Sequence, residues 1–116
     1  MSNKHLLIVE DEDSIRLTLR DFLKKKGYVV YVASDGVGAI KQLLDEHIDL
    51  IVTDYRMELL GGDYWMKFLE KFCSDKKILI TSGFLNPEYS ISFPVIYKPF
   101  KYPELEEKIR EALKED

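Results

Sequence analysis

Short apolar runs alternate along the chain with longer segments in which apolar residues recur at helical spacing. The apolar runs are rich in Ile and Val and occupy His5–Val9, Tyr28–Val32, Leu50–Thr53, Ile78–Thr81 and Val95–Tyr97. Runs of this length and composition predict buried strands of a parallel sheet. The chain therefore reads as five strands with helical segments between and after them.

The intervening segments carry apolar residues three or four positions apart, which predicts amphipathic helices. The residues concerned are Ile15, Leu19, Phe22 and Leu23; Val37, Ile40, Leu43 and Leu44; Trp65, Met66, Leu69 and Phe72; and Leu105, Ile109 and Leu113. We expect Asp13 or Ser14 to cap the first helix, Gly27 to end it, Ser34–Asp35 to cap the second, and Pro103 to lie in the first turn of the last.

These segments predict an α/β fold, a doubly wound five-stranded parallel sheet with helices on both faces. The segment Phe84–Phe93 contains Pro87 and has space for a loop or one helical turn, so we expect the fourth helix to be short or absent. In open parallel sheets of this kind, ligands bind beyond the carboxyl ends of the strands.

Length and composition limit the classes of function to which this chain can belong. The 116 residues amount to one domain (1–116), with 46% hydrophobic residues and a formal charge of −4. The acidic balance argues against binding to a nucleic-acid backbone. The chain has one cysteine, Cys73, and no long apolar run, so we expect a cytoplasmic protein without disulfide or membrane span.

The predicted strand ends carry the residues with candidate chemistry. Glu10 and Asp11 follow the first strand, Asp54 the third, Thr81 ends the fourth and Lys98 follows the fifth. Carboxylates ~4 Å apart repel by about 4 kcal/mol near a protein surface, so such a cluster needs a cation or raised pKa values. An all-oxygen cluster of this kind suits Mg²⁺.

Each of these residues also has a purely structural interpretation. Glu10 and Asp11 can cap the following helix, Asp54 can be a turn residue, Thr81 a β-branched strand residue and Lys98 a solvated lysine. Together, however, the ends of four predicted strands carry carboxylates, a hydroxyl and an ammonium group. This combination favours a shared functional site over four separate structural roles.

Four segments in this order and spacing carry a family resemblance: Leu6–Asp11, Asp49–Asp54 with Met57 and Gly62 behind it, Ile78–Gly83, and Val95–Phe100. Over essentially its whole length the chain resembles the receiver domains of bacterial two-component response regulators, of the chemotaxis-receiver type. The resemblance implies the flavodoxin-like strand order 2-1-3-4-5, which belongs to the family rather than to any spacing in this sequence.

The resemblance also implies residue roles. Asp54 is then the phosphate acceptor, and Glu10, Asp11, Asp54 and the backbone carbonyl of Arg56 hold Mg²⁺. Lys98 and Thr81 would contact phosphoryl oxygens, with Thr81 drawn inward, and the Lys98–Pro99 peptide would be cis.

The function implied is that of a signalling receiver domain rather than an enzyme. A sensor histidine kinase or histidine phosphotransfer protein would be the donor, and a downstream protein the target, with no direct contact to nucleic acid or membrane. The first predicted helix, with Arg16, Arg20 and the run Lys24–Lys26, offers a surface for the donor or is simply solvated. The chain is either a stand-alone receiver or a piece of a larger regulator.

Three positions depart from the family pattern. Glu10 stands in place of the usual first aspartate, Glu58 in place of a proline, and Val95 in place of the aromatic residue three positions before Lys98, with Tyr97 nearby. They leave the output mechanism open and keep alive the alternative of a binding module that works without phosphorylation.

Two further alternatives belong to other classes. The run Asp11–Ile15 faintly resembles the first motif of haloacid-dehalogenase-like phosphohydrolases, in which Asp11 would be the nucleophile, but the chain lacks their later acidic pair. A flavin-binding protein is disfavoured because no phosphate loop follows the first strand.

Overall fold

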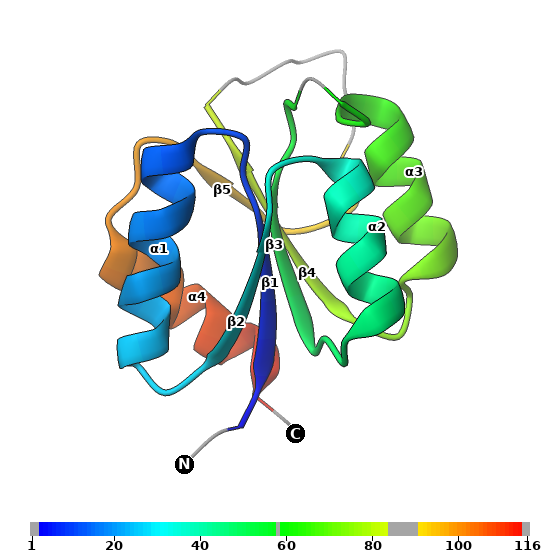
Figure 1. Ribbon diagram of the computed structural model, residues 1–116. Coiled ribbons are helices and arrows are strands. Elements are labelled where there is room, and N and C mark those ends of the chain that lie inside the picture. The colour runs from blue at the N-terminus through cyan, green and yellow to red at the C-terminus, as the bar shows by residue number, and fades with distance from the viewer. Residues whose placement is uncertain (1–2, 58, 84–90, 115–116) are drawn as a thin grey trace.

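The computed structural model describes residues 3–57, 59–83 and 91–114, and in them five parallel strands form one sheet in the order β2-β1-β3-β4-β5. The strands are β1 (His5–Val9), β2 (Val29–Ala33), β3 (Leu50–Asp54), β4 (Lys77–Ser82) and β5 (Val95–Tyr97). Helices α1 (Asp13–Lys25) and α4 (Tyr102–Leu113) cover one face of the sheet, and α2 (Gly36–Asp45) and α3 (Gly62–Phe72) cover the other (Figure 1). The predicted fold and strand order are confirmed.

The fourth helix in chain order, α4, is a full helix of 12 residues that follows β5. A fourth helix is therefore present, at the place where the spacing of Leu105, Ile109 and Leu113 predicts the last one. The helix expected to be short or absent was the one between β4 and β5. Most of the segment Phe84–Phe93, on which that expectation rested, falls on residues 84–90, which lie outside the described residues. None of the described helices is long and apolar enough to cross a membrane.

Two separate hydrophobic cores fix the sheet between its helix layers. Side chains alternate across a strand, so Leu7 and Val9 pack toward α2 and α3, while Leu6 and Ile8 pack toward α1 and α4. All five residues of β3 are buried. Because the strands are parallel and held on both faces, their carboxyl ends lie fixed along one edge of the sheet.

Helix ends follow the sequence prediction at three of four positions. Asp35 caps α2 by accepting a hydrogen bond from the Gly38 N–H at 2.8 Å, Gly27 has a φ of +100° just after α1, and Pro103 lies in the first turn of α4. The prediction that Asp13 or Ser14 caps α1 is wrong. Glu12 is the cap position, and its side chain makes no capping bond. The helix begins one residue earlier than expected, so both predicted residues already lie in its first turn.

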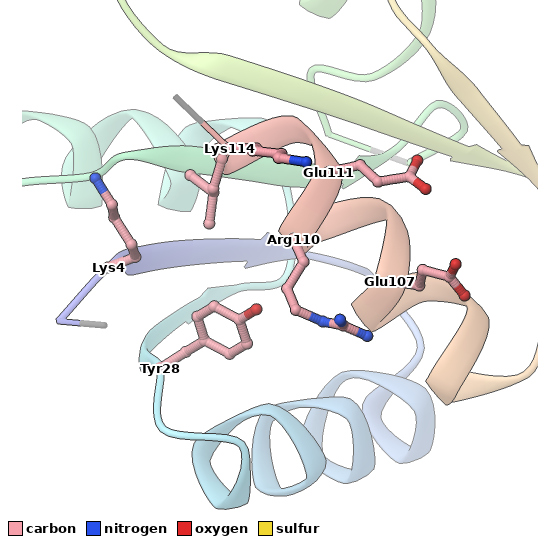
Figure 2. A pocket seen from close by; sticks show the side chains of 7 residues that line it. Lys4, Tyr28, Glu107, Arg110, Glu111 and Lys114 are labelled. Carbon is pink, nitrogen blue, oxygen red and sulfur yellow. The ribbon is translucent and has the colours of Figure 1, made fainter. Parts of the chain in front are cut away.

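A buried polar contact ties α4 to the start of β2. The Tyr28 hydroxyl donates to Glu106 Oε2 at 2.8 Å, and Arg110 Nε donates to the same carboxylate at 2.9 and 3.0 Å. Figure 2 shows Tyr28 and Arg110 in the wall of a surface hollow at the amino ends of the strands, the edge opposite to the candidate site. Burial, followed by the hydrogen bond and charge of Glu106, raises the pKa of Tyr28 to about 12, so the phenol remains a donor at neutral pH.

We expect Tyr28→Phe to lower the free energy of unfolding at pH 7 by about 1–2 kcal/mol, because Glu106 then loses one donor while the ring packing is kept. Although burial raises the pKa of Glu106, its bonds to Arg110 and Tyr28 lower it overall. The Glu106 contribution is therefore present above the ordinary carboxyl pKa and is lost as the pH falls through the lowered one, and the difference should shrink below about pH 4.

Urea denaturation of both proteins at pH 7 and pH 3.5 measures this difference. Tyr64→Phe is the matched control, because Tyr64 is 74% exposed, and its unfolding free energy should equal that of the wild type. Equal stability of Tyr28→Phe and wild type at pH 7 would show that the hydrogen bond contributes nothing.

Candidate functional site

Three carboxylates from two neighbouring strands meet at the carboxyl edge of the sheet. Glu10 and Asp11 follow β1, Asp54 ends β3, and one carboxylate oxygen of each lies within 4.8 Å of the others. Glu10 and Asp54 are buried and Asp11 is exposed. The structure thus brings together the carboxylates that the sequence analysis placed at the strand ends.

Lys98 joins this cluster from the end of β5, the outermost strand on that side of the sheet. Its Nζ lies 2.7 Å from Glu10 Oε1 and 3.3 Å from Asp54 Oδ2. Burial by itself would lower the pKa of Lys98, but the bond to Glu10 and the charges of Asp54 and Glu10 outweigh it and raise the pKa. The Lys98 N–H donates to the Ser82 carbonyl at 2.8 Å, and the Lys98–Pro99 peptide is cis, as the family resemblance implies.

The pKa of the Asp54 carboxyl is raised from its ordinary 3.8 to about 6. Burial is the largest cause, and the charges of Glu10 and Asp11 add to it, while Lys98 acts in the opposite direction. The cluster therefore carries more negative charge than one ammonium group neutralises. Hard oxygen ligands with excess negative charge, open on the Asp11 side, are the environment that a small divalent cation binds.

Thr81 and Arg56 are placed differently relative to this cluster. Thr81 is buried on β4 and pairs with Asp54 in the strand register, so the two residues are neighbours across the sheet. The Tyr55 N–H donates to the Thr81 carbonyl at 2.9 Å. Arg56 lies two residues past Asp54 in the sequence. It is exposed, and it lines a hollow together with Asp11.

Several supporting contacts around the site were missed by sequence reasoning. Thr53 Oγ1 accepts from Trp65 Nε1 at 2.8 Å and donates to the Asp54 carbonyl at 3.1 Å, which ties α3 to the backbone of Asp54. The Glu12 N–H donates to Glu10 Oε2 at 3.1 Å. A buried Thr–Trp pair twelve positions apart gives no periodic signal, so only the tertiary structure shows it.

Arg16 has a role other than the one expected from the sequence. Its side chain is 14% exposed, its Nη1 donates to the Glu10 carbonyl at 2.9 Å, and its Nη2 lies 2.6 Å from Asp13. Arg16 therefore holds the backbone at the carboxyl end of β1, and little of its side chain is left for a surface contact with a phosphodonor.

The departures from the family pattern lie in different surroundings. Val95 is half-buried and packs against the core under α2 and α3, whereas Tyr97 is 51% exposed. Tyr97 thus points to solvent rather than substituting for an aromatic residue at Val95. Glu58 lies outside the described residues.

The comparisons with known proteins agree with one another. The family model described as "Response regulator receiver domain" matches residues 6–110. The response regulator receiver protein CpdR of Brucella abortus is 30% identical over 116 residues, covering 95% of this chain and 97% of the relative. The sensor kinase CckA of the same organism is 29% identical over 93% of this chain, and YxdJ, a transcriptional regulatory protein of Bacillus subtilis, is 29% identical over 94%. The chain spans 12% of CckA and 50% of YxdJ.

Solved structures are similar over nearly the whole chain. The response regulator TrrA of Thermotoga maritima, in complex with Mg²⁺-BeF, superposes with a TM-score of 0.81 at 28% identity and covers 95% of this chain and 99% of its own. The chemotaxis response regulator CheY4 of Vibrio cholerae has a TM-score of 0.85 at 24% identity, over 97% of this chain and 100% of its own, which is a likeness of fold.

We expect Asp54→Asn to raise the free energy of unfolding at pH 7.5 in EDTA by about 1–2 kcal/mol, less than the full linkage value because the site is partly open to solvent. The Asp54 carboxyl titrates at about 6 in the folded chain and near 3.8 in the unfolded one. The folded state therefore binds more protons between these values, and its stability falls as the pH rises from about 4 to 6.

Urea denaturation at pH 4 and pH 7.5 checks this expectation, and the gain from Asp54→Asn should vanish at the lower pH. Asp45→Asn, at the exposed end of α2, is the control and should leave stability unchanged at both. A lower stability of Asp54→Asn at pH 7.5 would mean that the carboxylate is net stabilising where it lies.

Proposed function

The chain belongs to the response regulator receiver domain family, and on this premise we propose that Asp54 accepts a phosphoryl group from a sensor histidine kinase or a histidine phosphotransfer protein. A receiver domain is a signalling module rather than an enzyme. One observation carries the proposal: the buried Asp54 carboxylate lies within 4.8 Å of carboxylate oxygens of Glu10 and Asp11 and 3.3 Å from Lys98 Nζ.

The proposed step is a direct displacement at phosphorus. A carboxylate oxygen of Asp54 forms the new O–P bond while the P–N bond to the donor imidazole breaks, and the imidazole nitrogen keeps the electron pair. With acetyl phosphate, a P–O bond breaks and acetate leaves. Acceptor and donor are both anionic, so charge neutralisation and positioning matter more than proton transfer. Lys98 supplies a fixed positive charge at one Asp54 oxygen.

We propose Mg²⁺ as the cofactor, because the residues present fit it. The cluster offers only carboxylate oxygens, and the family resemblance adds the Arg56 carbonyl. A bound Mg²⁺ would supply positive charge to the acceptor and to the incoming phosphoryl group. Both Glu10 oxygens already accept hydrogen bonds, from Lys98 and from the Glu12 N–H. The exposed Asp11 is therefore the more direct ligand.

Phosphorylation would then act as a switch on protein–protein contacts. Lys98 and the Thr81 hydroxyl are the candidate partners of the phosphoryl oxygens, and Thr81 is adjacent to Asp54 across the sheet. The downstream target would be a protein, since a net charge of −4 opposes binding to a nucleic-acid backbone. We propose residues 1–116 as one receiver unit, which acts alone, as the coverage of CpdR supports, or within a larger regulator, as that of CckA supports.

Incubation with acetyl phosphate and Mg²⁺ should add about 80 Da to the wild type, the mass of one covalent phosphoryl group. Asp54→Ala should abolish the gain, because no other carboxylate of the cluster lies beside both Thr81 and Lys98. Lys98→Ala should still be modified, more slowly, because the acceptor remains. Intact-mass spectrometry measures all three, with Asp45→Asn as a control that should match the wild type.

Modification of Asp54→Ala to the wild-type extent would overturn the assignment. If the phosphoryl group were found on Asp11 instead, the hydrolase alternative would hold. An unmodified wild type under these conditions would favour the binding module that works without phosphorylation.

Mg²⁺ should bind the wild type with a dissociation constant that Asp11→Asn weakens by more than about tenfold, because an amide oxygen replaces a charged ligand. Glu10→Gln should weaken it less, since the Glu10 carboxylate is already bonded to Lys98. Isothermal titration calorimetry at pH 7.5 measures both constants. An unchanged affinity in Asp11→Asn would place the cation elsewhere.

A further inference from the structure

An apolar groove runs between α2 and α3 on the face of the sheet away from α1 and α4. Its walls are Ile40, Leu43 and Leu44 from α2 and Phe68 and Phe72 from α3, around a hollow of about 420 Å³. Figure 1 shows the two helices side by side on this face. None of these residues contributes to the Asp54 cluster, so the groove is independent of the proposed phosphorylation chemistry.

The rims of the groove expose large hydrophobic side chains. Leu44 is 80% exposed and Val37 44% on α2, and Tyr64 is 74% exposed and Phe72 64% on α3. Leu44 and Phe72 line the hollow itself. Val37 lies on the same stripe of α2 as Leu44, and Tyr64 on the same stripe of α3 as Phe68 and Phe72, because residues four, seven or eight positions apart share a helix face. A contiguous apolar surface of this kind, rimmed by polar residues, is typical of a protein interaction site.

The charges beside the groove are mostly positive, although the chain as a whole has a net charge of −4. Lys67 Nζ lies 5.4 Å from the centre of the Tyr64 ring and Lys71 Nζ 5.9 Å from that of Phe72. Lys41 lies three positions before Leu44 on α2, so the two side chains are neighbours on the helix surface. Within the described part of the chain, none of these three lysines forms an ion pair.

The acidic residues of the same region are mostly engaged elsewhere. Asp63 accepts from the Tyr55 hydroxyl, Glu70 from Ser92, and Asp75 pairs with Lys76 at the end of the groove. Asp45, at the end of α2, is the exception. The groove thus combines an apolar floor with three cationic side chains free to meet carboxylates of a partner.

We propose that the α2–α3 groove docks an acidic amphipathic helix of a partner protein, with its apolar side chains in the groove and its carboxylates on Lys41, Lys67 and Lys71. The hollow extends from Ile40 to Leu44 along α2, and the exposed Val37 lies one turn before Ile40, so the apolar stripe from Val37 to Leu44 is roughly 10 Å long at 1.5 Å per residue. This length accommodates two turns of a helix, so the partner would present apolar anchors at i, i+3 or i+4, and i+7, flanked by Glu or Asp.

The probe is a fluorescein-labelled 15-residue peptide with Leu at these anchor positions and Glu at the flanking ones. Fluorescence anisotropy should show saturable binding that weakens as NaCl is raised, because surface charges contribute. A peptide with Lys in place of each Glu, and one with Ser in place of each Leu, should each bind more weakly by at least about tenfold.

Variants locate the binding surface. Leu44→Asp should lower the affinity for the Glu peptide by more than about tenfold. Because Leu44 is 80% exposed, the variant should remain folded, which circular dichroism checks. The double change Lys67→Glu and Lys71→Glu should reverse the preference toward the Lys peptide. Leu17→Asp on α1 is the control and should bind like the wild type.

The proposal is overturned if folded Leu44→Asp binds the Glu peptide like the wild type or if the Lys peptide binds equally well. It is also overturned if no binding of the Glu peptide occurs at about 100 μM chain, a concentration between micromolar and millimolar dissociation constants. It is also overturned, in favour of a second copy of the chain as occupant, if the wild type sediments as a dimer that Leu44→Asp abolishes and the peptide does not compete.

Discussion

Electrostatic repulsion among carboxylates at one edge of the sheet is the constraint on which the site depends. Five parallel strands end at the same edge, and the cores on both faces prevent β1 and β3 from separating, so Glu10, Asp11 and Asp54 cannot move apart. Lys98 compensates part of this charge through its contacts to Glu10 and Asp54. Burial, with the remaining negative charge of Glu10 and Asp11 added to it, raises the pKa of Asp54, and the excess charge makes a cation favourable there.

The surroundings of Asp54 restrict its position more than a surface loop would. Thr53 holds its carbonyl while accepting from Trp65, so one hydrogen-bonded chain connects α3 to the acceptor backbone. The loop that follows is tight, because a Cβ at Gly61 would lie 2.5 Å from the Met57 carbonyl oxygen. Only glycine permits that approach. Arg56 and Met57 are therefore kept beside Asp11 at the mouth of the site.

Local sequence signals predicted the elements and failed at contacts that depend on tertiary structure. Apolar runs located the strands, and Asp35 and Gly27 marked helix ends, because these signals act within a few residues. The convergence of Asp11, Asp54 and Lys98 followed from strand parallelism together with the family resemblance. The inward turn of Arg16 was not predictable, because an arginine in the first turns of an amphipathic helix is usually solvated. The α2–α3 groove was not predictable either. Leu44 and Phe72 follow the same apolar period as the core residues of their helices, and only their exposure in the structure distinguishes them.

The strand register explains how a change at Asp54 can reach either helix layer without an aromatic residue at Val95. Thr81 pairs with Asp54 on β3 and with Ile96 on β5. Ile96 packs on the core under α1 and α4, while Val95, its neighbour, packs on the core under α2 and α3. Lys98 is bonded through its N–H to Ser82 and through Nζ to the carboxylates. A displacement of Thr81 or Lys98 would therefore act on β5 through backbone hydrogen bonds, and β5 contacts both layers. Where Val95 stands in place of an aromatic residue, the backbone of β4 and β5 connects the Asp54 cluster to both helix layers.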